Sequence, residues 1–223
     1  QKPKQVIEAM RFVMEAQYAN VHRGLHYMSE KASDAYEAVR DKVAELINAG
    51  SRDEIVFTRN ATESVNLVAY TWGRSALKPG DAVAVSEMEH HANLVPWQML
   101  RDAHGTELRI VKITDSGELD WDSLEQVFAD GKVKLLSLTH MSNVLGTYTP
   151  VERLAKFAHE RGAMLMLDGA QAIVHRAVDV RAIDADFYVF SGHKLYGPTG
   201  IGVLWAKPEI LAEMPVSYTH LTL

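Results

Sequence analysis

Short apolar segments alternate with amphipathic helical segments along most of this chain, and this alternation is what most restricts the folds it can adopt. Strands are expected at 55–58, 82–86, 108–113, 134–139, 163–167, 187–190 and 201–205. Helices are expected at 6–19, 31–49 with Gly50 as C-cap, 62–75, 93–103, 121–129 and 151–161. Apolar strands separated by helices are typical of a parallel sheet covered on both faces. The sequence therefore predicts an α/β fold with a mostly parallel sheet and helices on both faces.

Composition excludes several classes of function. The net charge is -6 and no basic run occurs, which argues against nucleic-acid or anionic-membrane binding. No apolar run reaches the ~18 residues that a membrane-spanning helix needs, so we expect no membrane partner and a cytoplasmic location. The 223 residues include no cysteine, which excludes disulfides and thiolate metal ligands.

Unusual polar residues follow the predicted strands. In parallel α/β sheets, ligands bind beyond the carboxyl ends of the strands. The segments at those positions are 59–64, 87–93, 140–146, 168–171 and 191–194. We therefore expect one site at this edge of the sheet.

Lys194 and Asp168 are the strongest candidates for chemistry. Lys194 follows an apolar strand and stands between Ser191-Gly-His and a glycine-rich turn at 197–200, a placement that suits a Schiff-base amine beside a bound phosphate. Asp168 ends a buried strand, where a carboxylate needs a partner such as a protonated pyridine nitrogen. The structural alternatives are a surface lysine and an aspartate that caps the next helix.

Other segments supply weaker signals. Thr62 opens a helix whose free N–H groups suit an anion, with Ser191 and His193 as further donors, although a simple helix cap is the alternative. His90 and His91 do not predict a metal site, because no carboxylate or cysteine set completes one. One of the two, which the spacing leaves open, is expected to stack on an aromatic cofactor. Asn143 is a plausible donor to a ring oxygen.

Six motifs together resemble a known family. They are Tyr-Ala-Asn-Val-His-Arg-Gly (18–24), Phe-Thr-Arg-Asn-Ala-Thr-Glu (57–63), Met-Glu-His-His-Ala-Asn-Leu-Val-Pro-Trp (88–97), His-Met-Ser-Asn-Val-Leu-Gly (140–146), Asp-Gly-Ala-Gln (168–171) and Ser-Gly-His-Lys (191–194). With them the chain resembles the group II cysteine desulfurases, which are class V aminotransferase-like, fold-type I pyridoxal phosphate enzymes.

The resemblance implies a role for each site residue. Lys194 would form the Schiff base with pyridoxal 5′-phosphate, and Asp168 would pair with the pyridine nitrogen. His90 would stack on the ring and help in proton transfer, and His91 would be structural. The remaining cofactor-binding residues would be Thr62, Ser191 and His193 at the phosphate, Ala61 through its backbone N–H, and Asn143 and Gln171 at the ring oxygen.

The resemblance also implies a reaction and its partners. Substrate L-cysteine, or selenocysteine, would lose its sulfur or selenium and leave alanine. The sulfur would pass to an enzyme cysteine and then to a sulfur-acceptor protein for iron–sulfur cluster assembly, in an enzyme that is a homodimer at full length. The alternatives are a selenocysteine lyase, another class V aminotransferase-like enzyme, or a non-catalytic α/β binding module.

The chain departs from the family pattern in extent. We expect residues 1–215 to be part of the large, cofactor-binding domain and residues 216–223 to lie outside the pattern. The small domain, which in the family carries the nucleophilic cysteine, is expected to be absent. On this interpretation the chain is a fragment that is inactive alone.

Overall fold

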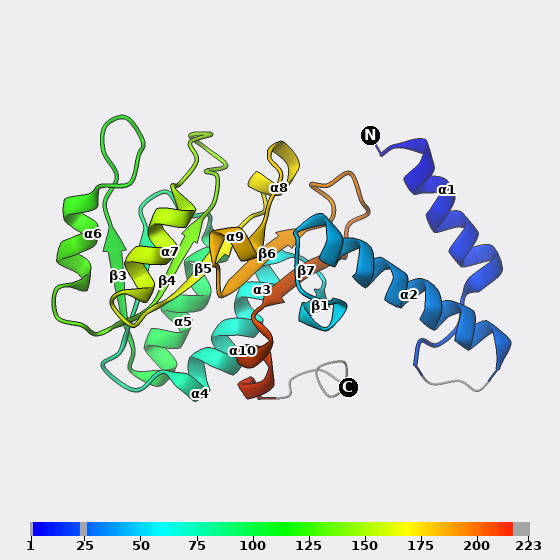
Figure 1. Cartoon of the computed structure of the whole chain (residues 1–223), viewed down its shortest axis with the longest axis horizontal. Helices are drawn as coiled ribbons and strands as arrows, with labels where there is room; N and C mark the ends of the chain where they lie inside the picture. The colour runs from blue at the N-terminus through cyan, green and yellow to red at the C-terminus, as the bar shows by residue number, and fades with distance from the viewer. Residues whose placement is uncertain (1, 23–25, 216–223) are drawn as a thin grey trace.

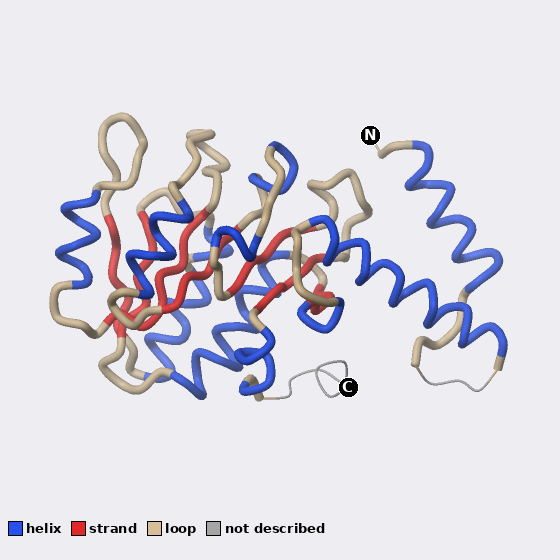
Figure 2. Tube along the Cα trace, viewed as in Figure 1, coloured by secondary structure: helices blue, strands red, loops and turns tan. Residues whose placement is uncertain are grey.

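A seven-stranded sheet forms the centre of the molecule, in a computed structural model that describes residues 2–22 and 26–215. Part of the 18–24 motif and the 216–223 segment lie outside the described residues. The strands are β1 Ile55–Thr58, β2 Ala82–Ser86, β3 Glu107–Val111, β4 Val133–Thr139, β5 Met164–Asp168, β6 Phe187–Ser191 and β7 Gly202–Ala206. Their order is β1-β7-β6-β5-β4-β2-β3, and Figure 2 shows them as one twisted layer flanked by helices.

The sheet is mostly parallel, as predicted. The pairs β2–β3, β2–β4, β4–β5 and β5–β6 are parallel, whereas β7 is antiparallel to both β6 and β1. Since β1 is antiparallel to β7, it runs in the same direction as β6. The carboxyl ends of all strands except β7 therefore meet at one edge of the sheet.

Helices cover both faces of the sheet, which confirms the predicted fold class (Figure 1). The helices and helical turns are α1 Lys4–Phe12, η1 Val13–Gln17, α2 Tyr27–Leu46, η2 Arg52–Glu54, α3 Ala61–Val68, η3 Ala69–Gly73, α4 Arg74–Ala76, η4 His91–Asn93, α5 Val95–His104, α6 Trp121–Phe128, α7 Val151–His159, α8 Ala172–His175, α9 Val180–Ile183 and α10 Pro208–Glu213. One apolar core lies between the sheet and α6, α7 and α9. The other lies between the sheet and α3, α5 and α10.

Side chains alternate between these cores along each strand. In β6, Tyr188 and Phe190 pack into the first core, and Phe187 and Val189 into the second. This period of two buries both faces of the strand, which explains its continuous apolar sequence.

Several predicted boundaries differ from the structure. Gly50 is not the cap of the second helix: α2 ends at Leu46, and Asn48 adopts the left-handed conformation with φ 53°. Asparagine tolerates this conformation because its short polar side chain bonds locally. The structure also contains α8, α9 and α10, which hydrophobic periodicity does not reveal because they have only four to six residues.

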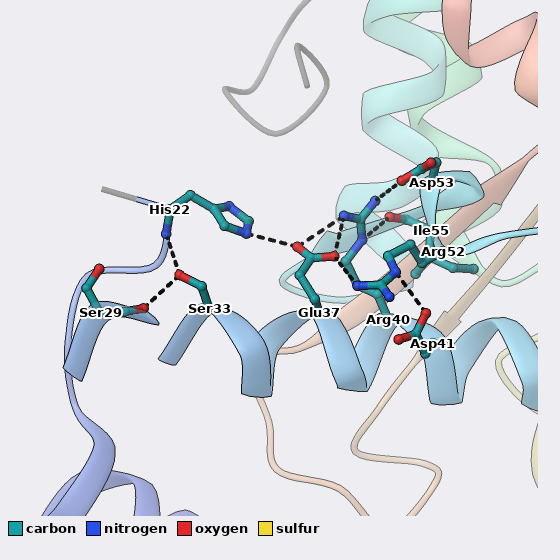
Figure 3. Close-up of polar contacts among 9 residues, drawn as sticks. All are labelled: His22, Ser29, Ser33, Glu37, Arg40, Asp41, Arg52, Asp53 and Ile55. Carbon is teal, nitrogen blue, oxygen red and sulfur yellow. Dashed lines mark hydrogen bonds and ion pairs between the residues drawn. The ribbon is translucent and has the colours of Figure 1, made fainter. Parts of the chain in front are cut away.

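The helix α1 stands apart from the two cores, whereas α2 reaches the first core near its end through Ala44. No residue of α1 is buried, and α1 lies to one side of the sheet (Figure 1). At α2, Glu37 accepts contacts from His22, Arg40 and Arg52 (Figure 3). Arg40 Nε also donates to the carbonyl of Ile55, 3.2 Å away, so this cluster joins α2 to β1. Within the described ranges, no helix has the length and apolar character needed to cross a membrane.

Candidate functional site

One cavity lies at the carboxyl edge of the sheet, and every candidate site residue lines it. Its volume is about 240 Å³. The residues predicted from sequence are Ala61, Thr62, His90, Asn143, Asp168, Gln171, Ser191, His193 and Lys194. They come from the ends of β1, β2, β4, β5 and β6, which the shared strand direction brings together.

The lysine loop is shaped by backbone hydrogen bonds after β6. Lys194 N donates to the Ser191 carbonyl at 3.2 Å, and Gly197 N donates to the Gly192 carbonyl at 2.9 Å. A Cβ on Gly197 would lie 2.8 Å from that same carbonyl oxygen, so the turn requires glycine. Lys2 Nζ donates to the carbonyl of His193 at 3.0 Å, which brings the start of the described chain to this loop.

The first turn of α3 forms the second wall of the cavity. Ala61 N donates to Ser191 Oγ at 2.9 Å, which fixes the helix N-terminus against the end of β6. The Ser191 hydroxyl then keeps its own proton free to donate. Thr62 is exposed to the cavity, and among the described residues its N–H makes no recorded hydrogen bond. This corner thus offers N–H and O–H donors at the positive end of a helix, which suits an anion.

A close contact in the backbone makes that corner possible. Gly202, the first residue of β7, packs against Asn60, and a Cβ there would lie 2.4 Å from Asn60 Cα. Glycine therefore lets the start of α3 pass directly over β7 and reach β6.

Asp168 lies at the buried floor of the cavity. It is 6% exposed, and within residues 2–22 and 26–215 its carboxylate accepts one recorded hydrogen bond, from Ala170 N at 2.9 Å. Burial raises the pKa of the Asp168 carboxyl, while the Ala170 N–H, Lys194 and His90 oppose that shift. A buried carboxylate with one unpartnered oxygen is well matched to a cationic N–H group of a ligand.

The two adjacent histidines have different positions. His90 lines the cavity, whereas His91 begins the turn η4 and does not line it. His90 Nδ1 accepts a hydrogen bond from Ala92 N at 3.1 Å, so its Nε2 is the nitrogen that carries the proton in the neutral ring. Among the described residues no group of three or more potential ligands is placed to hold a metal ion.

Five further residues line the cavity and were not predicted as site residues. They are Asn60, Ala92, Thr139, Met141 and Ala170. Asn60 caps α3 through Oδ1, which accepts from Glu63 N at 2.8 Å. Asn60, Ala92, Met141 and Ala170 lie in the segments that follow predicted strands, and Thr139 ends one, so the rule of strand ends is the signal that could find them.

The cavity fits a phosphorylated pyridine aldehyde on three grounds. The helix N-terminus offers anion donors, and Asp168 offers an acceptor for a ring N–H. The Lys194 amine makes no recorded hydrogen bond or ion pair in the described part of the chain, and it lines the same cavity. These three features match the phosphate, the ring nitrogen and the aldehyde of pyridoxal phosphate, which are the groups that a protein has to hold.

Comparison with known proteins defines the class. The sequence profile of the aminotransferase class-V family matches residues 1–220, and the chain belongs to that family. Enzymes of this family, including the cysteine desulfurases, use pyridoxal phosphate.

The more specific resemblance is to cysteine desulfurases. The chain is 54% identical to a cysteine desulfurase of Dickeya dadantii over 215 residues, which cover 96% of this chain and 52% of the relative. It is 51% identical to one from Escherichia coli, with 96% and 53% covered. The chain thus spans about half the length of the curated relatives it matches.

Solved structures agree. A cysteine desulfurase from Escherichia coli superposes with a TM-score of 0.87 at 44% identity, covering 96% of this chain and 53% of that one. The apo cysteine desulfurase of Thermococcus onnurineus gives 0.89 at 42% identity, with 96% and 52% covered. The protein SspA in complex with cysteine gives a TM-score of 0.89 at 28% identity, with 99% of this chain and 63% of that one covered.

Proposed function

We propose that this chain is the cofactor-binding part of a cysteine desulfurase, which converts L-cysteine to L-alanine and passes the sulfur to a thiol. One observation carries the proposal: Lys194, Asp168 and His90 converge on one cavity beside a helix N-terminus. The relatives named above support the reaction, and the neighbour determined in complex with cysteine supports the substrate.

Lys194 and Asp168 have opposite tasks in this proposal. Bound pyridoxal phosphate supplies an electron-accepting ring that stabilises negative charge at the substrate Cα. Lys194 Nζ would hold the cofactor covalently, and its amine, when free, would be the base for the proton on the substrate Cα. The Asp168 carboxylate keeps the ring nitrogen protonated, because the pair of opposite charges is favoured in a buried site.

The remaining residues bind and orient. Thr62, Ser191 and His193 hold the phosphate, and Ala61 orients the Ser191 hydroxyl through the 2.9 Å hydrogen bond. The imidazole of His90, which lines the cavity, would stack on the ring and pass protons. Asn143 and Gln171 line the same cavity and would donate to the ring oxygen.

The reaction needs a thiol that accepts the sulfur, and these residues do not supply one. The chain contains no cysteine, so the accepting thiol comes from outside these residues in the proposed enzyme. We extend the proposal to the remaining expectations for the whole protein, on the support of its family membership. They are a homodimer, a sulfur-acceptor protein that serves iron–sulfur cluster assembly, and a cytoplasmic location.

Covalent trapping tests the site without requiring turnover. The chain is incubated with one equivalent of pyridoxal phosphate, reduced with borohydride and digested, and the peptides are weighed by mass spectrometry. We expect one phosphopyridoxyl group on Lys194 and none in Lys194→Ala, with Lys156→Ala, an exposed lysine of α7, as the matched control. An unmodified Lys194 in the wild-type chain would refute the proposal.

A further inference from the structure

Three side chains spaced four residues apart form a hydrogen-bonded relay behind the cavity. Asn93 Nδ2 donates to Glu89 Oε2 at 2.7 Å, and Trp97 Nε1 donates to Asn93 Oδ1 at 3.1 Å. Asn93 is 0% exposed and Trp97 1% exposed. We call Glu89, Asn93 and Trp97 the loop relay.

The loop relay is anchored to two strands of the sheet. Glu89 Oε1 accepts from Ser86 Oγ at 2.5 Å and from Thr139 N at 3.0 Å. Asn93 Oδ1 also accepts from Ser137 Oγ at 2.6 Å. The relay therefore ties the segment after β2 to β4, its neighbour in the sheet, and to α5.

His90 is held between the two anchored positions of the relay. Asn93 N donates to the His90 carbonyl at 2.8 Å, and Ala92 N donates to His90 Nδ1 at 3.1 Å. Both bonds lie within the segment from Glu89 to Asn93, which the relay holds at its first and last residues. A change at Glu89 would thus move the imidazole that lines the cavity.

The direction of the donors in the relay is determined by chemistry. The indole of Trp97 and the N–H of Thr139 can only donate. Asn93 has to turn its oxygen toward Trp97, so its NH₂ group faces Glu89. The two carboxylate oxygens of Glu89 then face two groups that can only donate, Thr139 N and the NH₂ of Asn93. A glutamine at position 89 would point its own NH₂ group at one of these donors in either orientation.

We propose that Glu89 is a positioning residue that acts through the loop relay to hold His90 over the cofactor cavity. The importance of His90 for the reaction rests on the proposed function, whereas the relay itself rests on the contacts above. Burial, with Asp168 as the charged neighbour on β5, raises the pKa of Glu89 to about 7. When Glu89 is protonated, it can donate to the Ser86 hydroxyl, which can accept as well as donate. The N–H of Thr139 and the NH₂ of Asn93 then still have an acceptor on Glu89.

A pair of substitutions tests the direction of the donors. Glu89→Gln should lower the melting temperature by roughly 5 °C, because one buried donor loses its acceptor. The double variant Glu89→Gln with Asn93→Asp restores the pattern, since the amide introduced at position 89 then donates to a carboxylate that still accepts from Trp97. The double variant should melt within about 2 °C of the wild type. Glu125→Gln, on the exposed side of α6, is the matched control.

Nitrogen NMR of the His90 ring supplies a readout that general destabilisation does not move. In the wild type and the double variant, Nδ1 should be the unprotonated acceptor, and in Glu89→Gln this preference should be lost. Cofactor affinity, measured by fluorescence, should fall about tenfold in Glu89→Gln and recover in the double variant.

The outcomes separate the two proposals. A double variant as impaired as Glu89→Gln, or a His90 spectrum unchanged in Glu89→Gln, overturns the role of Glu89. If Glu89→Gln fails to fold, recovery of the His90 spectrum in the double variant still supports that role, and lack of recovery overturns it. Since this spectrum needs no cofactor, a wild-type chain that binds no pyridoxal phosphate counts against the proposed function alone.

Discussion

Two clusters of charged and polar groups in this molecule are completed in different ways. At α2, Glu37 lies 2.9 Å from His22, 3.0 Å from Arg40 and 3.5 Å from Arg52, so its charge is matched within the protein (Figure 3). At the cavity, Asp168 is more deeply buried, yet in the described chain it accepts one recorded hydrogen bond. The first cluster joins elements of the fold, and the second has groups to which a ligand would bind.

The difference in partners explains why a carboxylate stabilises the fold in one cluster and offers a ligand-binding group in the other. A carboxylate surrounded by cations at a solvent-exposed surface contributes only modestly to stability, because water can replace its partners. A buried carboxylate with few partners reduces stability and is retained where a ligand completes it. Substitution of Asp168 should therefore lower ligand affinity and raise the stability of the ligand-free chain. Substitution of Glu37 should lower stability and leave ligand affinity unchanged.

The largest effect is expected at the floor of the cavity. Asp168→Asn keeps an oxygen that accepts from Ala170 N but removes the buried charge. Affinity for pyridoxal phosphate, measured by fluorescence titration, should fall by roughly 30-fold or more, because the ring N–H loses its charged partner. The melting temperature of the cofactor-free chain at pH 8 should rise, since a raised pKa means that the ionised carboxyl opposes folding above that pKa.

Asp34→Asn, an exposed position on α2, is the control for this substitution and should change neither quantity. A lower melting temperature in Asp168→Asn would show that the carboxylate stabilises the cofactor-free fold. The contrast between the two clusters would then be wrong.

The next effect concerns a histidine behind the cavity. His140 is 2% exposed, and its Nδ1 lies 3.0 Å from Tyr188 Oη. Burial lowers the pKa of His140 to about 4, helped by Arg176 and opposed by Glu152. The unfolded chain therefore takes up a proton on this histidine near pH 6.5, whereas the folded chain does so only near pH 4. The free energy of unfolding accordingly decreases as the pH falls from about 6.5 to 4.

We expect this histidine to account for about 3 kcal/mol of the acid destabilisation. The free energy of unfolding in urea, measured between pH 7 and pH 4, should fall less steeply for His140→Gln than for the wild type. The difference between the two curves isolates His140, since Asp168 and Glu89 titrate in both proteins. Parallel curves would show that His140 is not kept neutral by burial.

The same two clusters show what the sequence could predict. The residues around Asp168 were found because each follows an apolar strand, and strand direction alone brings them to one edge. The sequence does not predict a role for Glu89, because that role depends on contacts with Ser86, Asn93 and Thr139, which require the register of β2 against β4. The direction of β7 was likewise not visible, since an antiparallel strand buried on both faces has the same apolar sequence as a parallel one.

The smallest effect is expected at the α2 cluster. Glu37→Gln keeps the size of the side chain but removes the charge shared with Arg40 and Arg52. The free energy of unfolding should fall by about 1 kcal/mol, and by less in concentrated salt, because partly exposed ion pairs are screened. Cofactor affinity should not change, since Glu37 does not line the cavity. A loss of affinity in this variant would mean that α2 and the cavity are coupled, and the separation of a structural cluster from a ligand-binding one would fail.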